Sequence, residues 1–173
     1  MPTAVAVFAS SRRHGNTGQL MDRVASELRI EVVDLSKKNI SAFDYEHRNR
    51  QDDFESLIEH VLEFEQIIFA SPVYWYSVCP PMKIFLDRIS DLLELPDLLA
   101  NGRRLRGKGV YVLCTSIEDE PTPSFVNVWR ETCNYLGMNY RGLLHANCRD
   151  GYVPALYEDA ITAFVRRVRD SAC

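Results

Sequence analysis

The chain has 173 residues, of which 46% are hydrophobic and 25% are charged, a composition that is typical of a globular domain and excludes disordered, collagen-like and repetitive proteins. Its 20 Lys and Arg against 24 Asp and Glu give a net charge of -4, which lacks the basic excess of a nucleic-acid-binding domain. We therefore expect one domain over residues 1–173 and no nucleic-acid partner.

The cysteines favour a reducing compartment. They are scattered, contain no C-x-x-C pair and are odd in number, which is unlike a disulfide framework or a metal site. No apolar run approaches the ~18 residues of a membrane span, and the N-terminus lacks the basic and apolar regions of a secretion signal. We expect a cytoplasmic protein without a metal site or a membrane contact. The cysteines are Cys79, Cys114, Cys133, Cys148 and Cys173.

Short apolar runs alternate with amphipathic helical patterns along the whole chain. The runs that predict strands are 4–9, 30–35, 66–70, 109–114 and 143–146, and the periodic segments that predict helices are 17–28, 52–62, 80–93, 123–136 and 155–168. This alternation is typical of a parallel sheet covered by helices on both faces. We expect a doubly wound α/β fold with five strands, whose ligands bind beyond the carboxyl ends of the strands. Loops 10–16, 71–79 and 115–122 lie at that edge.

The first of these loops, SSRRHGNTG, runs directly from a strand into a helix. The amides at the helix start and the hydroxyls of Ser10 and Thr17 are suited to a phosphate. Arg12 adds a forked cationic donor, and Gly15 lets the backbone pass close to the phosphate oxygens. The loop therefore predicts a site for a phosphate monoester.

The same loop excludes several other classes of site. It has neither the G-x-G-x-x-G of dinucleotide domains nor the G-x-x-x-x-G-K-[ST] of nucleoside triphosphatases. A cysteine-dependent phosphatase would need a thiol at the start of the loop, where this chain has serines. The alternative to a phosphate site in this loop is a polar turn in which Asn16 or Thr17 caps the helix. We expect Arg13 and His14 to face solvent.

The second loop, SPVYWYSVC, is rich in aromatic residues. Pro72 stiffens the turn out of the strand, and three aromatic residues follow Val73. A flat conjugated ring would stack on Tyr74 or Trp75 and form hydrogen bonds with the backbone from Val73 to Tyr76. The alternative, an aromatic patch between subunits, is compatible with a ligand site.

Three motifs occur together in the first half of the chain: Ser10-x-Arg12-x-x-Gly15-Asn16-Thr17, Ser71-Pro72-Val73-Tyr74-Trp75 and Lys83-x-Phe85-x-Asp87-Arg88. Together they resemble those of the NAD(P)H-dependent FMN reductases of flavodoxin-like fold. The resemblance implies strand order 2-1-3-4-5, FMN as the cofactor, NADPH or NADH as co-substrate, and a homodimer or homotetramer. The iron–sulfur flavoproteins of the same family carry a cysteine cluster after the second strand, and residues 36–50 contain no cysteine. In the third motif, Lys83 and Asp87 have the spacing of an ordinary helical ion pair.

The resemblance also implies roles for individual residues. The FMN phosphate would be held by Ser10, Arg12, Gly15, Asn16 and Thr17, the isoalloxazine would be lined by Pro72, Val73, Tyr74, Trp75 and Tyr76, and the third side would be closed by Thr115 and Ser116. No side chain is assigned as catalytic, because the cofactor carries the chemistry. The third loop differs from the Gly-rich segment of relatives, and its acidity at 118–120 is expected to select against anionic substrates.

The implied function is an oxidoreductase that passes two electrons from NAD(P)H through FMN to a small-molecule acceptor, either a quinone, azo or nitro compound or a flavin. The alternative is a flavodoxin-type electron carrier, which the mild net charge disfavours because such carriers dock with a strongly acidic face. A second alternative is a dinucleotide-binding domain in which Asp34, at the end of the second predicted strand, binds a ribose. The chain lacks the glycine fingerprint that such a domain needs. Two interpretations stay open for the cations Arg103, Arg104, Arg106 and Lys108: a contact with the NADPH 2′-phosphate, or a solvated turn.

Overall fold

The computed structural model describes residues 3–171, so the expected free thiol of Cys173 lies outside the described residues. Five parallel strands form the sheet in the order β2-β1-β3-β5-β6. They are β1 (Ala4–Phe8), β2 (Val32–Asp34), β3 (Gln66–Tyr74), β5 (Gly109–Ser116) and β6 (Asn139–Asn147). Counted over these parallel strands alone, the order is 2-1-3-4-5, and the flavodoxin-like doubly wound fold is confirmed.

The sixth strand, β4 (Ser77–Val78), corrects the expected count of five. It pairs antiparallel with the end of β3, in a segment for which the sequence predicted only a loop. The sequence predicted a strand over 66–70 and a turn at Pro72, whereas β3 continues through Pro72 to Tyr74. In the structure, β1 pairs with β3 only as far as Ala70, so Pro72 lies past the end of that ladder, where its missing N–H removes no bond to β1.

The five predicted helices are present, with shifted ends. They are α1 (Asn16–Leu28), α2 (Phe54–Val61), α3 (Pro80–Arg88), α6 (Pro123–Leu136) and α7 (Glu158–Asp170). The segment predicted as one helix over 80–93 is divided into α3 and a short α4 (Asp91–Glu94), and a further helix α5 (Leu99–Arg104) follows. Among residues 3–171 no helix is long and apolar enough to cross a bilayer.

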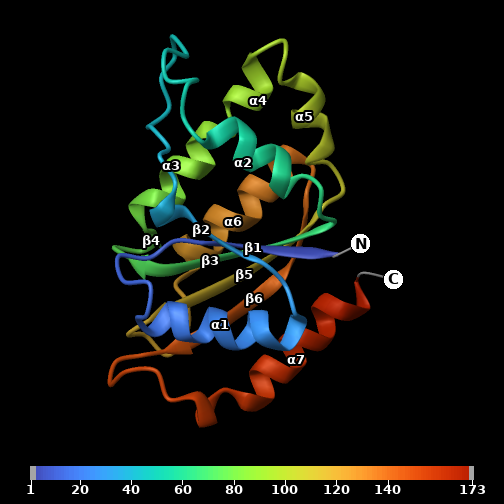
Figure 1. Ribbon diagram of the computed structural model, residues 1–173. Helices are drawn as coiled ribbons and strands as arrows, with labels where there is room; N and C mark the ends of the chain where they lie inside the picture. The colour runs from blue at the N-terminus through green and yellow to red at the C-terminus, as the bar shows by residue number, and fades with distance from the viewer. Residues whose placement is uncertain (1–2, 172–173) are drawn as a thin grey trace.

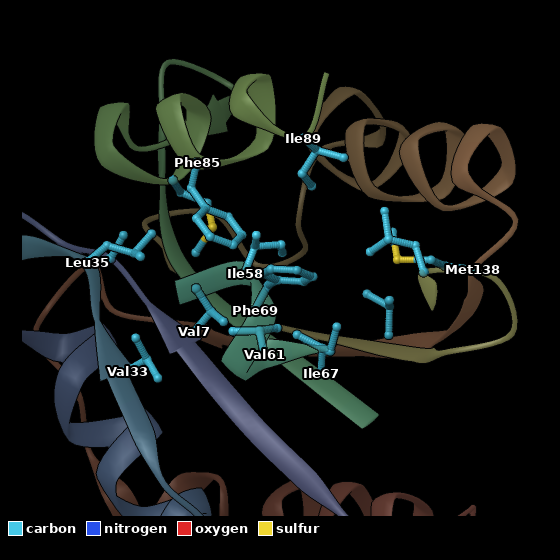
Figure 2. Packing of buried hydrophobic residues seen from close by; sticks show 14 of the residues in the cluster. Val7, Val33, Leu35, Ile58, Val61, Ile67, Phe69, Phe85, Ile89 and Met138 are labelled. Atoms are coloured by element: carbon cyan, nitrogen blue, oxygen red, sulfur yellow. The ribbon is translucent and has the colours of Figure 1, made fainter. Parts of the chain in front are cut away.

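Two hydrophobic layers hold the helices to the sheet. In β1, Val5 and Val7 belong to one buried cluster and Ala6 and Phe8 to the other, which is the period-2 alternation of a strand buried on both faces. Figure 1 shows α1 and α7 on one face of the sheet and α2, α3 and α6 on the other. Figure 2 shows the layer between the sheet and α2, α3 and α6, in which side chains of the sheet and of α2 point toward one another around the labelled Phe69.

A long connection, residues 38–53, joins the 3-10 turn after β2 to α2. Arg88 of α3 anchors it from inside: the guanidinium is fully buried, forms ion pairs with Asp52 and Asp91, and lies 4.7 Å over the ring of Phe54. The last residue of the third sequence motif therefore has a structural role. Its neighbours Lys83 and Asp87 form the expected helical ion pair.

Candidate functional site

A cavity of ≈ 420 Å³ lies at the carboxyl ends of the parallel strands, within the range of small-molecule sites. The three loops singled out in the sequence meet there, and every site residue expected from the sequence lines it. The lining consists of Ser10, Arg12, Gly15, Asn16, Thr17, Pro72, Val73, Tyr74, Trp75, Tyr76, Thr115 and Ser116, together with Ile117, Glu118, Thr122 and Cys148.

The loop between β1 and α1 forms one end of the cavity. The first backbone hydrogen bond of α1 runs from the Gln19 amide to the Gly15 carbonyl, at 3.0 Å. The amides of residues 16–18 precede this ladder and are donors without a carbonyl partner in it. Gly15 is the N-cap residue and forms no side-chain cap, so the alternative of a turn capped by Asn16 or Thr17 is wrong.

The hydroxyl of Thr17 is buried and lies 2.7 Å from the hydroxyl of Thr115 in β5. Because each hydroxyl has one proton and the pair uses only one of them, the second proton is available to a group in the cavity. The contact joins the helix start to the strand end on the far side of β3. The two sides of the cavity are thereby held at a set separation.

The hairpin of β3 and β4 forms the aromatic wall. Its register pairs Tyr74 with Ser77, which leaves Trp75 and Tyr76 as a two-residue turn with φ values of 47° and 65°. Such turns favour Asn-Gly, since bulky residues are strained at positive φ. Strain of this kind is concentrated at ligand sites. At the base of the hairpin, the Ser71 hydroxyl accepts a hydrogen bond from the Cys79 amide at 3.0 Å.

The third side contains a histidine that the sequence did not single out. Ser116 Oγ lies 2.8 Å from His145 Nε2 and accepts a hydrogen bond from the Glu118 amide at 3.1 Å. Burial lowers the pKa of His145, although Glu120 opposes this, so the imidazole is neutral at pH 7. His145 therefore orients Ser116 from behind the cavity. The register of β6 against β5, which pairs Cys114 with His145, depends on tertiary packing and left no local signal.

Four lining residues were not assigned from the sequence. Ile117, Glu118 and Thr122 lie in the third loop, which the sequence did mark, and Cys148 follows β6. The carboxyl end of the last predicted strand would have indicated Cys148 by the same rule that found the other loops. Burial raises the pKa of the Cys148 thiol to about 11, so it is not ionised at neutral pH.

Several expectations for charged residues are corrected. Arg13 does not face solvent: it is partly buried and forms ion pairs with Asp22 and Asp34. Asp34 is itself buried and accepts hydrogen bonds from the amide and hydroxyl of Ser36, so it is not open to a ribose. His14 is exposed as expected.

The cations before β5 do not belong to this cavity. Arg103 and Arg104 lie in α5 rather than in a turn, and β5 begins after them at Gly109. They therefore stand at the amino edge of the sheet, opposite the carboxyl ends. Lys108 is buried and donates to the Phe64 carbonyl at 2.6 Å. None of these four cations lines the cavity.

The family described as NADPH-dependent FMN reductase matches residues 2–145. YwqN of Bacillus subtilis (strain 168), provisionally named an NAD(P)H-dependent FMN-containing oxidoreductase, is 27% identical over 144 residues, or 79% of this chain and 80% of that protein. The Trp repressor binding protein from Bacillus subtilis has a similar structure, with a TM-score of 0.72 and 21% identity over 95% of this chain and 96% of that chain.

A third similar structure is an FMN-dependent NADH-azoreductase from Bacillus anthracis str. Ames Ancestor in complex with FMN. It has a TM-score of 0.70 and 8% identity over 98% of this chain and 100% of that chain. At such identities the two solved structures establish the fold alone. The family match covers most of the chain, and on that ground the chain belongs to the NADPH-dependent FMN reductase family, whose members are oxidoreductases that use FMN.

Proposed function

We propose that the cavity binds FMN and that the protein passes two electrons from NADPH or NADH to a small-molecule acceptor, either a quinone, azo or nitro compound or a flavin. One observation carries the proposal: a single cavity has helix-start amides at one end and an aromatic hairpin at the other. The residues of the cavity would hold FMN, which would supply two-electron redox chemistry between a nicotinamide and the acceptor.

The phosphate end has donors suited to a dianion. Asn16 and Thr17 present amides at the positive end of the α1 dipole, and Arg12 is an exposed cation beside them. A methyl group at Gly15 would lie 3.2 Å from the Arg12 carbonyl oxygen, tighter than an ordinary contact. Glycine therefore keeps this turn compact. These residues, with Ser10, fit the phosphate monoester of FMN. Riboflavin has no phosphate for them to bind.

The ring end has walls suited to a flat heterocycle. Val73 and Tyr74 extend β3 beyond its pairing with β1 and carry the hairpin to β4, so the strand reaches the ring end of the cavity. Backbone groups from Val73 to Tyr76 would bond the edge of the isoalloxazine, while the aromatic side chains would pack on its face. Thr115 and Ser116 would close the third side. The role of these residues would be to hold the isoalloxazine face to face with the nicotinamide or with the acceptor.

The rim of the cavity favours neutral or cationic acceptors. Glu118 lines it, and Asp119 and Glu120 are exposed next to it. Asp119 is held by a 2.8 Å hydrogen bond from the Asn147 side-chain amide, so part of this acidic loop is fixed in place. A negative potential at the mouth lowers the encounter rate of anionic acceptors.

We further propose that the protein is a homodimer or homotetramer. Trp75 is 92% exposed and Tyr76 is 61% exposed at the tip of the hairpin. Two large aromatic side chains beside a ligand cavity form the kind of surface that another subunit covers. Light scattering of the FMN-loaded protein at micromolar concentration tests this, and a fully loaded monomer would contradict it.

The decisive experiment is anaerobic stopped-flow reduction of the FMN-loaded protein by NADH and by NADPH, followed by a panel of quinone, azo, nitro and flavin acceptors. We expect at least one nucleotide to bleach the flavin absorption and at least one acceptor to restore it. Because donor and acceptor would occupy the same open face of the ring in turn, steady-state double-reciprocal lines should be parallel. Intersecting lines would contradict the shared face.

The same experiment separates the proposed enzyme from an electron carrier. If neither nucleotide reduces the bound flavin within minutes, while dithionite reduces it at once, the protein behaves as a carrier and the reductase assignment is wrong. A protein that takes up no FMN in the first place contradicts the assignment of the cavity.

A further inference from the structure

Arg13 is the most extensively engaged side chain of the loop between β1 and α1. Its guanidinium donates two hydrogen bonds to the carboxylate of Asp22, at 3.0 and 2.6 Å. Its Nε lies 3.6 Å from an Asp34 carboxylate oxygen, and its central carbon lies 5.0 Å from the centre of the Phe8 ring. One side chain thereby joins the end of β1, the end of β2 and the second turn of α1.

Gly18 makes this arrangement possible. A methyl group at Gly18 would lie 1.8 Å from the Arg13 carbonyl oxygen and 3.2 Å from an Arg13 guanidinium nitrogen. The loop backbone therefore lies directly on the first turn of α1, and the side chain runs past Gly18 to reach Asp22 one turn later. Any other residue at position 18 would push the loop off the helix.

Asp34 gives Arg13 a second, buried partner. Its side chain is 6% exposed, and one of its carboxylate oxygens has no hydrogen-bond partner within the described residues. The Arg13 Nε is the cation near that oxygen. Because an isolated buried charge is strongly unfavourable, Arg13 is held in place by the carboxylate that it neutralises.

We propose that Arg13 is a positioning residue for the phosphate site. Arg13 is not among the residues that line the cavity, so it would act through the loop rather than on the ligand. Clamped to Asp22 and Asp34, the loop presents Arg12 and the helix-start amides to the cavity in one arrangement before the ligand arrives. A preorganised loop binds more tightly, since less conformational freedom is lost on binding. The inference rests on the proposed function, because the clamp matters to a ligand with a phosphate.

A simpler explanation for an effect of Arg13 is long-range attraction between its charge and the phosphate. The two explanations predict opposite signs for one variant. Asp22→Asn removes a negative charge near the site, which would strengthen binding of a dianion through space. If Arg13 positions the loop, the same change weakens binding, because it loosens the clamp.

The test uses the full-length apoprotein and compares its affinity for FMN and for riboflavin, followed by quenching of flavin fluorescence. Arg13→Ala and Asp22→Asn should each weaken FMN by about tenfold, the range of a lost charge-assisted hydrogen bond, and change riboflavin affinity by less than about twofold. Arg23→Ala is the matched control: Arg23 is on the same helix and pairs with Glu27 and Glu158 at the surface. It should change neither affinity by more than about twofold.

Each outcome decides the question. Selective loss of FMN binding in both variants supports the clamp. A gain of FMN affinity in Asp22→Asn, an equal loss for riboflavin, or no change in either variant overturns it. The melting temperature of each apoprotein is measured in parallel, and Asp22→Asn keeps the test valid if Arg13→Ala folds poorly. Wild-type protein that binds neither flavin contradicts the proposed function itself, a result that the variants cannot produce.

Discussion

The hydroxyl oxygens of Thr17 and Thr115 are 2.7 Å apart, although 98 positions separate the two residues in the chain. One belongs to the start of α1 and the other to the end of β5, which is separated from β1 in the sheet by β3, and both line the cavity. It connects the loop proposed to hold a phosphate to the loop that closes the third side.

This pair gives a test by double substitution. Thr17→Val and Thr115→Val should each lower the free energy of unfolding by about 1–3 kcal/mol, because each leaves a buried hydroxyl without its partner. The double variant should lose less than the sum of the two, since both polar groups are then replaced by methyl groups of similar shape. Urea unfolding of the FMN-free protein measures all four forms. Additive losses would show that the two hydroxyls do not depend on each other.

Arg12 provides a test of the phosphate end. Arg12→Ala should weaken FMN by about 1.5–3 kcal/mol, the range for hydrogen bonds to charged groups, and should leave riboflavin nearly unchanged. Arg12 is exposed, so the substitution should not alter the melting temperature of the apoprotein. Fluorescence titration of the apoprotein gives both affinities. Equal affinity of the wild type for FMN and riboflavin would contradict the phosphate assignment.

The strained turn of the hairpin predicts a trade between stability and activity. Trp75 has a φ of 47° and is almost fully exposed, so Trp75→Gly should raise the free energy of unfolding by up to about 1 kcal/mol while removing the ring beside the cavity. We expect slower turnover with nucleotide and acceptor. Trp75→Ala is the control, because it removes the ring and keeps the strained backbone. A glycine variant no more stable than the alanine variant would argue against stored strain.

The buried Arg88 network predicts sensitivity to acid. Burial raises the pKa of Asp52, but hydrogen bonds from Arg88 and from the amides of Ser41 and Phe54 outweigh it and bring the pKa below the ordinary value. A lowered native pKa means that the stabilisation is present above the ordinary value and is lost as the pH falls through the native one.

Asp52→Asn tests this network. At neutral pH it should cost about 3–5 kcal/mol, because it leaves part of the Arg88 charge uncompensated in the interior. Its stability should then fall less steeply than that of the wild type as the pH is lowered. Urea midpoints measured from neutral to acidic pH give both quantities. Asp44→Asn is the control, since the Arg48 partner of Asp44 is largely exposed, and it should shift the urea midpoint at neutral pH far less than Asp52→Asn does.

The amino-acid sequence determined the succession of the five parallel strands and the five longer helices, and with it the three loops at the ligand edge. These features depend on local information: the spacing of apolar residues identifies each strand and helix, and a parallel sheet then brings all carboxyl ends to one side. That is why the sequence alone places Ser10, Tyr74 and Thr115, which are far apart in the chain, at one ligand edge, and all three line the cavity.

The tertiary structure alone decided how individual side chains are used. Arg13 was expected in solvent because no residue near it in the sequence predicts its ion pair with Asp34. The close approach of the loop backbone to Gly18 could not be predicted from the sequence either. His145 lies behind Ser116 only because β6 pairs with β5 in one particular register. Charges, hydroxyls and turns find their partners across strands and helices, and those distances are set by packing that a local pattern does not contain.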